Sequence, residues 1–166
     1  NDRYEHILPK INISKKIDNM LPFSGNLSLN TSVINKNYDT NVLETVNTND
    51  LKFKSFSKIS NKGFYSNFDF LIKNSNSNAK NSKTYKNKES SYISGLVQFN
   101  TSLPLLKNDE KYKKILNPKL ALKISPNHTK NNRKDDNKID INNLFSFDRN
   151  MGKDYVEGGI SLTYGS

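Results

Sequence analysis

Cysteine is absent from the 166 residues, so neither a disulfide framework nor a thiolate metal site lies within this chain. Long apolar runs are absent as well. No stretch approaches the roughly 18 apolar residues of a membrane-spanning helix, and no apolar run near the start resembles the core of a signal peptide. Because the chain opens on Asn1 and stops at Ser166, directly after a predicted strand, we interpret it as a piece of a longer protein.

Apolar side chains are few. They make up 33% of the residues and the mean hydropathy is −0.80, values that usually indicate disorder. Asn, Lys, Ser and Ile crowd the chain, and three of these are products of AT-rich codons, so we attribute most of the net charge of +10 to genome composition. The charge still permits anionic partners, either nucleic acid or phosphorylated lipid.

Equipment for catalysis or metal binding is scarce. His6 and His128 have no second histidine or carboxylate at ligand spacing. The carboxylates gather late in the chain but lack the spacing of a calcium loop: Asp135, Asp136, Asp140, Asp148, Asp154 and Glu157. The lysine clusters near Lys83 and Lys130 show no nucleic-acid-binding pattern. We therefore expect no enzyme, no cofactor, no metal and no nucleic-acid partner.

What the chain does have is alternation of apolar and polar residues with a period of two, which is typical of strands with two different faces. In the segment 21–33, for example, Leu27 and Leu29 alternate with Ser28 and Asn30. The pattern predicts about seven strands, at residues 7–14, 21–33, 48–58, 64–73, 92–105, 116–125 and 156–164. One shared face would carry Leu27, Leu29, Val97, Phe99, Leu120, Leu122, Ile160 and Leu162.

The lengths of these strands and of their connections favour a membrane. The strands are longer than the ~5–6 residues usual in soluble proteins and match the ~9–11 of a tilted membrane strand. The expected connections alternate between short (15–20, 59–62), long (35–47, 74–90, 127–153) and moderate (106–114), as in outer-membrane barrels. We therefore predict an all-β fold, an antiparallel transmembrane β-barrel arc within a single domain covering 1–166, with apolar residues facing lipid and polar residues a wet lumen.

Two of the long connections differ in composition. Residues 74–91 are almost free of apolar side chains, and we expect them to be mobile and outward-facing. The segment 144–154 instead gathers apolar and charged groups, which predicts a structured cap folded over the lumen, with a turn at Gly152. The candidate site residues are Leu144, Phe145, Phe147, Asp148, Arg149, Gly152, Asp154 and Glu157.

The end of the chain also carries a family resemblance. The strand NPKLALKISPN is bracketed by Pro118 and Pro126, and after a polar spacer comes INNLFSFDRNMGKDYVEGGISLTYG. This stretch resembles the C-terminal barrel of the outer-membrane lipopolysaccharide-assembly family (LptD), whose members show N-L-F-x-x-x-R-x-x-G-x-D-R-x-E-G-G-x-x-x-x-Y-G. The matching residues are Asn143, Leu144, Phe145, Arg149, Gly152, Asp154, Glu157, Gly158, Gly159, Tyr164 and Gly165; Tyr155 stands where the family has Arg.

The resemblance implies a large closed barrel in the cell outer membrane. Such a barrel holds a plug lipoprotein in its lumen, receives lipopolysaccharide from periplasmic bridge proteins, and releases it laterally into the outer leaflet. That activity is translocation and not covalent chemistry. Two alternatives from other classes remain open: a generic outer-membrane barrel of the porin or autotransporter type, and a soluble carbohydrate-binding β-sandwich.

Overall fold

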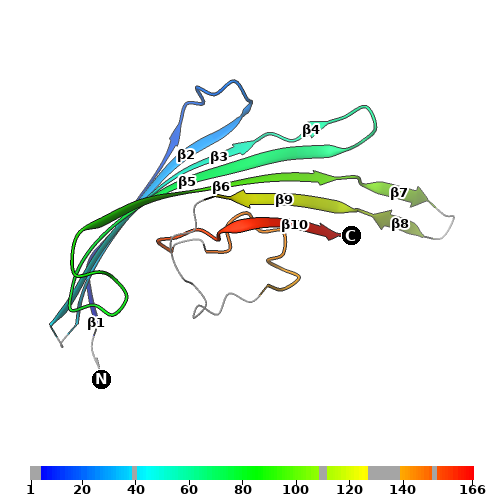
Figure 1. The fold of residues 1–166 in the computed structure, drawn as a ribbon. Coiled ribbons are helices and arrows are strands. Elements are labelled where there is room, and N and C mark those ends of the chain that lie inside the picture. Colours follow the sequence, from blue (N-terminus) through cyan, green and yellow to red (C-terminus); the bar gives the residue numbers. More distant parts are fainter. Residues whose placement is uncertain (1–4, 39–40, 109–111, 127–138, 151–152) are drawn as a thin grey trace.

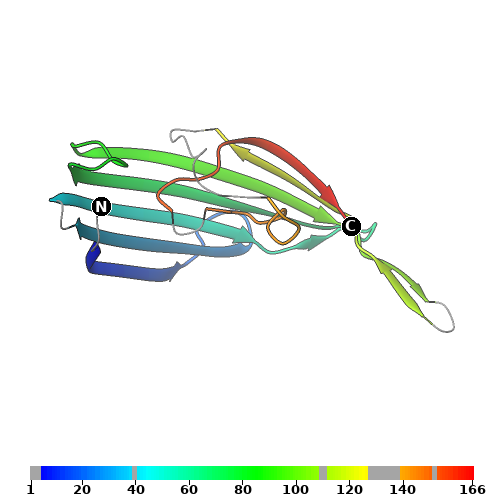
Figure 2. The same cartoon turned by 90° about the horizontal axis from the view of Figure 1, so that it is seen from below.

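The chain folds into one long, curved antiparallel sheet (Figures 1 and 2). The computed structural model describes residues 5–38, 41–108, 112–126, 139–150 and 153–166. Within these ranges the fold is all-β, and no helix is long and apolar enough to cross a membrane. The sheet order is β1-β2-β3-β5-β6-β9-β10, with the short β4 paired to β5. Strands β1 and β10 form its edges, so the sheet is open and no closed barrel is seen in the described part of the chain.

The strands of this sheet are unusually long. Strand β5 has 16 residues, and β2 and β3 have 14 each, well above the ~5–6 of an average strand. Their bounds are β1 Glu5–Ile17, β2 Gly25–Tyr38, β3 Val42–Ser55, β4 Lys58–Ile59, β5 Tyr65–Lys80, β6 Ser90–Ser102, β7 Leu105–Asn108, β8 Lys113–Leu116, β9 Lys119–Ser125 and β10 Gly159–Gly165.

Pairing in register gives the sheet two chemically different faces. Leu29 lies opposite Leu51, which in turn lies opposite Ile72, and Phe99 lies opposite Leu122. Because directly opposed residues share a face, the predicted apolar set does lie on one face, called the apolar face below. The other, called the polar face, carries residues such as Asp50, Lys73, Gln98 and Lys123.

Many polar side chains of the polar face are buried, and many apolar side chains of the apolar face are exposed. On the polar face Lys73, Ser94 and Gln98 are almost completely buried, with exposed fractions of 1–2%. On the apolar face Val97 is 48% exposed and Ile160 is 77% exposed. The covering layer consists of residues 139–150 and 153–158, which lie along the hollow side of the curved sheet in Figure 1. The apolar face has no such layer in the described part of the chain.

Of the connections that we expected to be long loops, 35–47 is mostly strand and 74–90 is nearly half strand. Strands β2 and β3 continue through residues 35–38 and 42–47 around a tight turn with Asn41 at φ 61°, and β5 continues to Lys80. The expected alternation of short and long connections is therefore wrong, and so is the expectation of a loop over 74–80. The physical reason is that backbone pairing continues without apolar side chains, provided the neighbouring strand stays within hydrogen-bonding reach.

Other boundaries follow from local chemistry. The short connection expected at residues 59–62 is confirmed as a hairpin: β4 pairs with β5, and Gly63 takes φ 82° in the turn. The strand expected over 92–105 stops at Ser102, before Pro104, which has no N–H for the ladder. Strands β7 and β8 then form a separate hairpin that projects beyond one end of the sheet (Figure 2). Strand β3 ends at Ser55 and β4 begins at Lys58, and between them the register on β5 shifts by one residue, as a bulge near Ser55 would produce.

An aromatic cluster on the apolar face buries Phe53 to 1% exposure. Its ring stacks on Phe70 with centroids 5.2 Å apart and lies 5.6 Å from Phe68, which Phe23 meets edge-on. Gly25 makes room for this cluster. A Cβ at that position would lie 2.5 Å from the Lys54 carbonyl oxygen and 2.6 Å from the Phe53 ring.

We expect Gly25→Ala to lower the free energy of unfolding by about 1–3 kcal/mol, because the added methyl group overpacks a site closed by backbone. Denaturant unfolding of the whole protein, followed by circular dichroism, measures this effect. Gly95→Ala is the matched control, since the nearest atom to a Cβ there is the Leu71 carbonyl oxygen at 3.9 Å. Equal stability of the two variants would contradict the close approach at Gly25.

Candidate functional site: the polar face and its covering segment

The covering segment, residues 139–150 and 153–158, crosses the polar face over β5, β6 and β9. Its first turn is set by Asp140, whose carboxylate Oδ1 accepts the N–H groups of Asn142 (2.8 Å) and Asn143 (3.0 Å). A second turn is set by Asp148, whose Oδ1 accepts the Asn150 N–H at 2.9 Å. Side chains of this kind stabilise turns by replacing backbone partners, so the sequence itself folds the segment into two compact bends.

Side chains of the strands bind the segment through its backbone carbonyl groups. Lys123 Nζ donates to the Ser146 oxygen at 2.7 Å, and Gln98 Nε2 donates to the Phe145 oxygen at 3.2 Å. Lys73 Nζ donates to the Lys153 oxygen at 2.9 Å. These donors come from three different strands, so the contact fixes the position of the segment across the sheet and not only against one strand.

The carbonyl of Asp154 is a second focus of these contacts. Its oxygen accepts the hydroxyl of Ser75 at 2.6 Å and the hydroxyl of Tyr92 at 2.5 Å, and Tyr92 also reaches the Asp154 carboxylate at 3.3 Å. Tyr85, in the connection between β5 and β6, lies beside the same carboxylate. Burial, together with the charge of Asp154, raises the pKa of the Tyr85 hydroxyl above its usual range. The hydroxyl therefore stays protonated and can donate a hydrogen bond.

A small apolar core anchors the end of the segment. Val156 packs between Leu71 and Leu96, all three are at most 3% exposed, and Phe147 packs against this group. We expected Val156 on the apolar face of the final strand, and that prediction is wrong. Strand β10 begins only at Gly159, which has φ 103°, a conformation that L side chains rarely adopt. The preceding residues are thereby free to turn inward.

Charged groups pair within the site. Lys73 Nζ lies 2.8 Å from Asp50 Oδ1 and 3.0 Å from its Oδ2, in a position where the lysine is 1% exposed. Arg149 holds Glu157 in bidentate fashion through Nε and Nη2, and Lys123 lies 3.8 Å from the same carboxylate. The Lys73–Asp50 pair is buried and joins β5 to β3, whereas Glu157 is partly exposed. Charge-assisted pairs have short, directional geometry, so the Arg149–Glu157 pair ties two parts of the covering segment together.

The structure brings most of the predicted site residues together. Phe145, Phe147, Asp148, Arg149, Asp154 and Glu157 belong to the covering segment, Leu144 lies half-buried beside them, and Gly152 lies outside the described residues. The Phe145 ring approaches Gly165 of β10, where an added Cβ would lie 3.1 Å away. The partner of Arg149 is Glu157. Asp148 sets the turn at Asn150, and the Asp154 carboxylate accepts the hydroxyl of Tyr92.

Sequence reasoning missed the residues of the sheet that hold the segment, above all Asp50, Lys73, Tyr92, Gln98 and Lys123. Their alternation already placed Gln98 and Lys123 on the polar face. No sequence signal shows which of these groups meet, because Asp50 and Lys73 become neighbours only through the register of β3 on β5. The arrangement fixes a covering segment on a wet surface. Among the residues that the structure describes, no group of three or more His, Cys, Asp or Glu side chains could hold a metal ion.

We expect Lys73→Ala to destabilise the fold by about 3–5 kcal/mol, because it leaves the Asp50 carboxylate buried without its cation. Lys52→Ala is the matched control. Lys52 lies 3.9 Å from the same carboxylate but is partly exposed, and such pairs contribute only about 0–1 kcal/mol. Denaturant unfolding measures both. If Lys73→Ala costs no more than Lys52→Ala, the buried pair does not hold the site together.

Comparison with known proteins adds no relative to this picture. No model of a known protein family, no curated protein and no solved structure matches the chain significantly. The geometry of the sheet and the resemblance carried by residues 117–165 are therefore the grounds for a function.

Proposed function

We propose that this chain is an arc of an outer-membrane β-barrel that inserts lipopolysaccharide into the outer leaflet. The observation that carries the proposal is the reversed burial of the two faces. Apolar side chains such as Val97, Phe99 and Leu122 are exposed, while Lys73 and Gln98 are buried on the hollow side. A sheet of this kind is stable where lipid contacts its outer face and a polar lumen lies against its inner face.

The dimensions of the sheet support a membrane position. A tilted strand crosses the hydrocarbon layer with ~9–11 residues, and β2, β3, β5 and β6 have 13–16 residues. The two open edges, β1 and β10, expose unpaired backbone groups that further strands of a larger barrel would pair. A soluble sandwich is less compatible, because it buries its apolar face against a second sheet.

The covering segment supports the lipopolysaccharide-assembly family in particular. Its sequence motif, which includes Leu144, Phe145, Arg149 and Glu157, carries the resemblance. The same residues lie on or near the hollow face of the sheet in the structure. A generic porin or autotransporter barrel would account equally well for the sheet but would not explain this sequence motif. In the proposed barrel the polar face lines the path of lipopolysaccharide beside a plug lipoprotein, and periplasmic bridge proteins deliver the lipid.

Cysteine labelling tests the membrane position. The chain has no cysteine, so a residue such as Val97→Cys or Leu122→Cys is unique within it. In isolated outer membranes we expect both variants to react with a lipid-soluble maleimide and not with a charged one. Asn26→Cys, an exposed site on the polar face, is the control and reacts with the charged reagent. If Val97→Cys and Leu122→Cys react with the charged reagent as fast as Asn26→Cys does, the membrane position is contradicted.

Depletion of the protein in its native cells tests the transport role. We expect depletion to lower the amount of lipopolysaccharide at the cell surface, because the lipid stays on the periplasmic side of the outer membrane. Surface labelling of its sugars measures this loss. Complementation with Phe145→Ala/Arg149→Ala should restore surface lipopolysaccharide poorly and raise permeability to bulky antibiotics, because the covering segment loses its aromatic contact and its bidentate ion pair.

The matched control is Lys83→Ala/Lys86→Ala, two exposed residues of the connection between β5 and β6, which should complement in full. Unchanged surface lipopolysaccharide after depletion would reject the transport role and leave the generic barrel. Full complementation by Phe145→Ala/Arg149→Ala would reject the role of the covering segment alone.

A further inference from the structure

The apolar face is not apolar along its whole length. On β5 the outward residues Phe68, Phe70 and Ile72 are followed by Asn74, Asn76 and Asn78. On β3 the same change occurs between Leu51 and Asn49. The strands thus continue past the apolar band and present amides and hydroxyls on the same face, at the end of the sheet where β2 turns into β3 and β5 into β6.

A row of hydrogen bonds marks this change across four strands. Thr31 Oγ1 donates to Asn49 Oδ1 at 2.9 Å, Asn49 Nδ2 donates to Asn74 Oδ1 at 3.3 Å, and Asn74 Nδ2 donates to Ser91 Oγ at 3.3 Å. Asn76 Nδ2 also donates to Asn74 Oδ1, at 2.7 Å. Because these groups satisfy one another, the row can lie at the edge of a hydrocarbon layer without losing hydrogen bonds.

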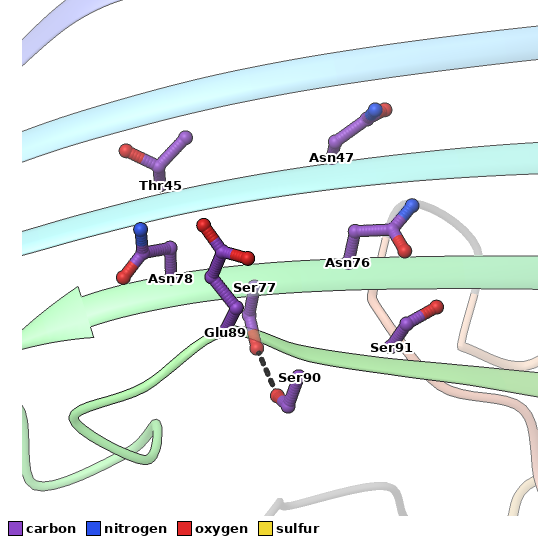
Figure 3. Close-up of a pocket in the computed structure, with 8 residues that line it drawn as sticks. All are labelled: Thr45, Asn47, Asn76, Ser77, Asn78, Glu89, Ser90 and Ser91. Carbon is purple, nitrogen blue, oxygen red and sulfur yellow. Dashed lines mark hydrogen bonds between the residues drawn. The ribbon is translucent and has the colours of Figure 1, made fainter.

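Beyond the row lies a pocket of about 400 Å³ (Figure 3). Its lining consists of Thr45, Asn47, Asn76, Ser77, Asn78, Glu89, Ser90 and Ser91. In Figure 3 Thr45, Asn47, Asn76, Asn78, Glu89 and Ser91 point to one side, while Ser77 and Ser90 meet on the other through a 2.8 Å hydrogen bond. The Asn47 amide oxygen is buried and makes no hydrogen bond with the described residues.

The chemistry of this lining selects one class of ligand. Amides and hydroxyls both donate and accept hydrogen bonds, and the Glu89 carboxylate only accepts. This combination suits an uncharged ligand with several hydroxyl groups. Neither Lys nor Arg lines the pocket, so it offers no cation to a phosphate group. The volume is at the lower end of the ~300–1,000 Å³ range of small-molecule sites.

We propose that this pocket binds the uncharged sugar head group of a membrane glycolipid whose acyl chains lie along the apolar band. The position of the acyl chains rests on the proposed membrane location; the sugar site rests on the pocket itself. Asn76 and Asn78 donate to and accept from the sugar hydroxyls, and Glu89 accepts from them. The site would hold a lipid of the leaflet against the outer wall of the sheet, apart from the polar face and its covering segment.

Competition between two lipids tests the proposal. The whole protein is placed in nanodiscs that contain equal amounts of digalactosyl diacylglycerol and of phosphatidylcholine with the same acyl chains, and native mass spectrometry counts the lipid retained on the protein. We expect at least a fivefold preference for the glycolipid in the wild type. Asn78→Ala/Glu89→Ala should abolish it, since both side chains are exposed and take no part in the hydrogen-bonded row.

Asn26→Ala is the control, an exposed asparagine on the opposite face, and it should keep the preference. Absence of any preference in the wild type, or a preference that survives in Asn78→Ala/Glu89→Ala, would overturn the sugar site. Failure of the protein to enter nanodiscs would instead count against the membrane location. In that event the same variants are compared for binding of free digalactose. Binding by the wild type and by Asn26→Ala, but not by the double variant, supports the sugar site. Any other result rejects it.

Discussion

The register of the antiparallel ladder is the constraint on which the rest of this structure depends. Side chains alternate with a period of two, so a slip of one residue between any two strands would move every apolar group of one strand to the other face. Along the path β2-β3-β5-β6-β9-β10 the pairing runs without a shift. In the described main sheet the register slips by one residue between Ile7 and Lys10, around Pro9, and again on β5 between β3 and β4. This continuity turns seven locally alternating segments into two extended faces of opposite character.

The polar face then requires partners. A lysine that is 1% exposed, such as Lys73, is stable only with a carboxylate and further acceptors around it. Asp50 supplies the charge, and the backbone carbonyl of Lys153 supplies an acceptor. The covering segment gains in return a compact apolar anchor at Val156. Each side satisfies groups that the other leaves open, which explains why a polar surface can be closed without a large apolar core.

The apolar face is organised along the strands as well as across them. Near the Phe53 cluster it is apolar, and beyond Ile72 it becomes a hydrogen-bonded surface of asparagine, threonine and serine. The two zones differ in the solvent that suits them: hydrocarbon for the first and a wet, hydroxyl-rich layer for the second. The division is compatible with the proposed membrane position, in which the apolar zone meets lipid and the ends of the strands meet polar surroundings.

Much of this architecture was determined by the sequence alone. The alternation in segments such as 21–33 and 116–125 predicted the strands and the shared face of Leu29 and Leu122. The cluster of apolar and charged residues around Phe145 predicted a segment with contacts of its own. The tertiary structure decided the rest: that residues 74–80 are strand, that Val156 turns inward, and that Arg149 pairs with Glu157. The physical reason is that side-chain patterns report which face a residue prefers, whereas strand ends and ion pairs depend on neighbours that the ladder brings together from distant parts of the chain.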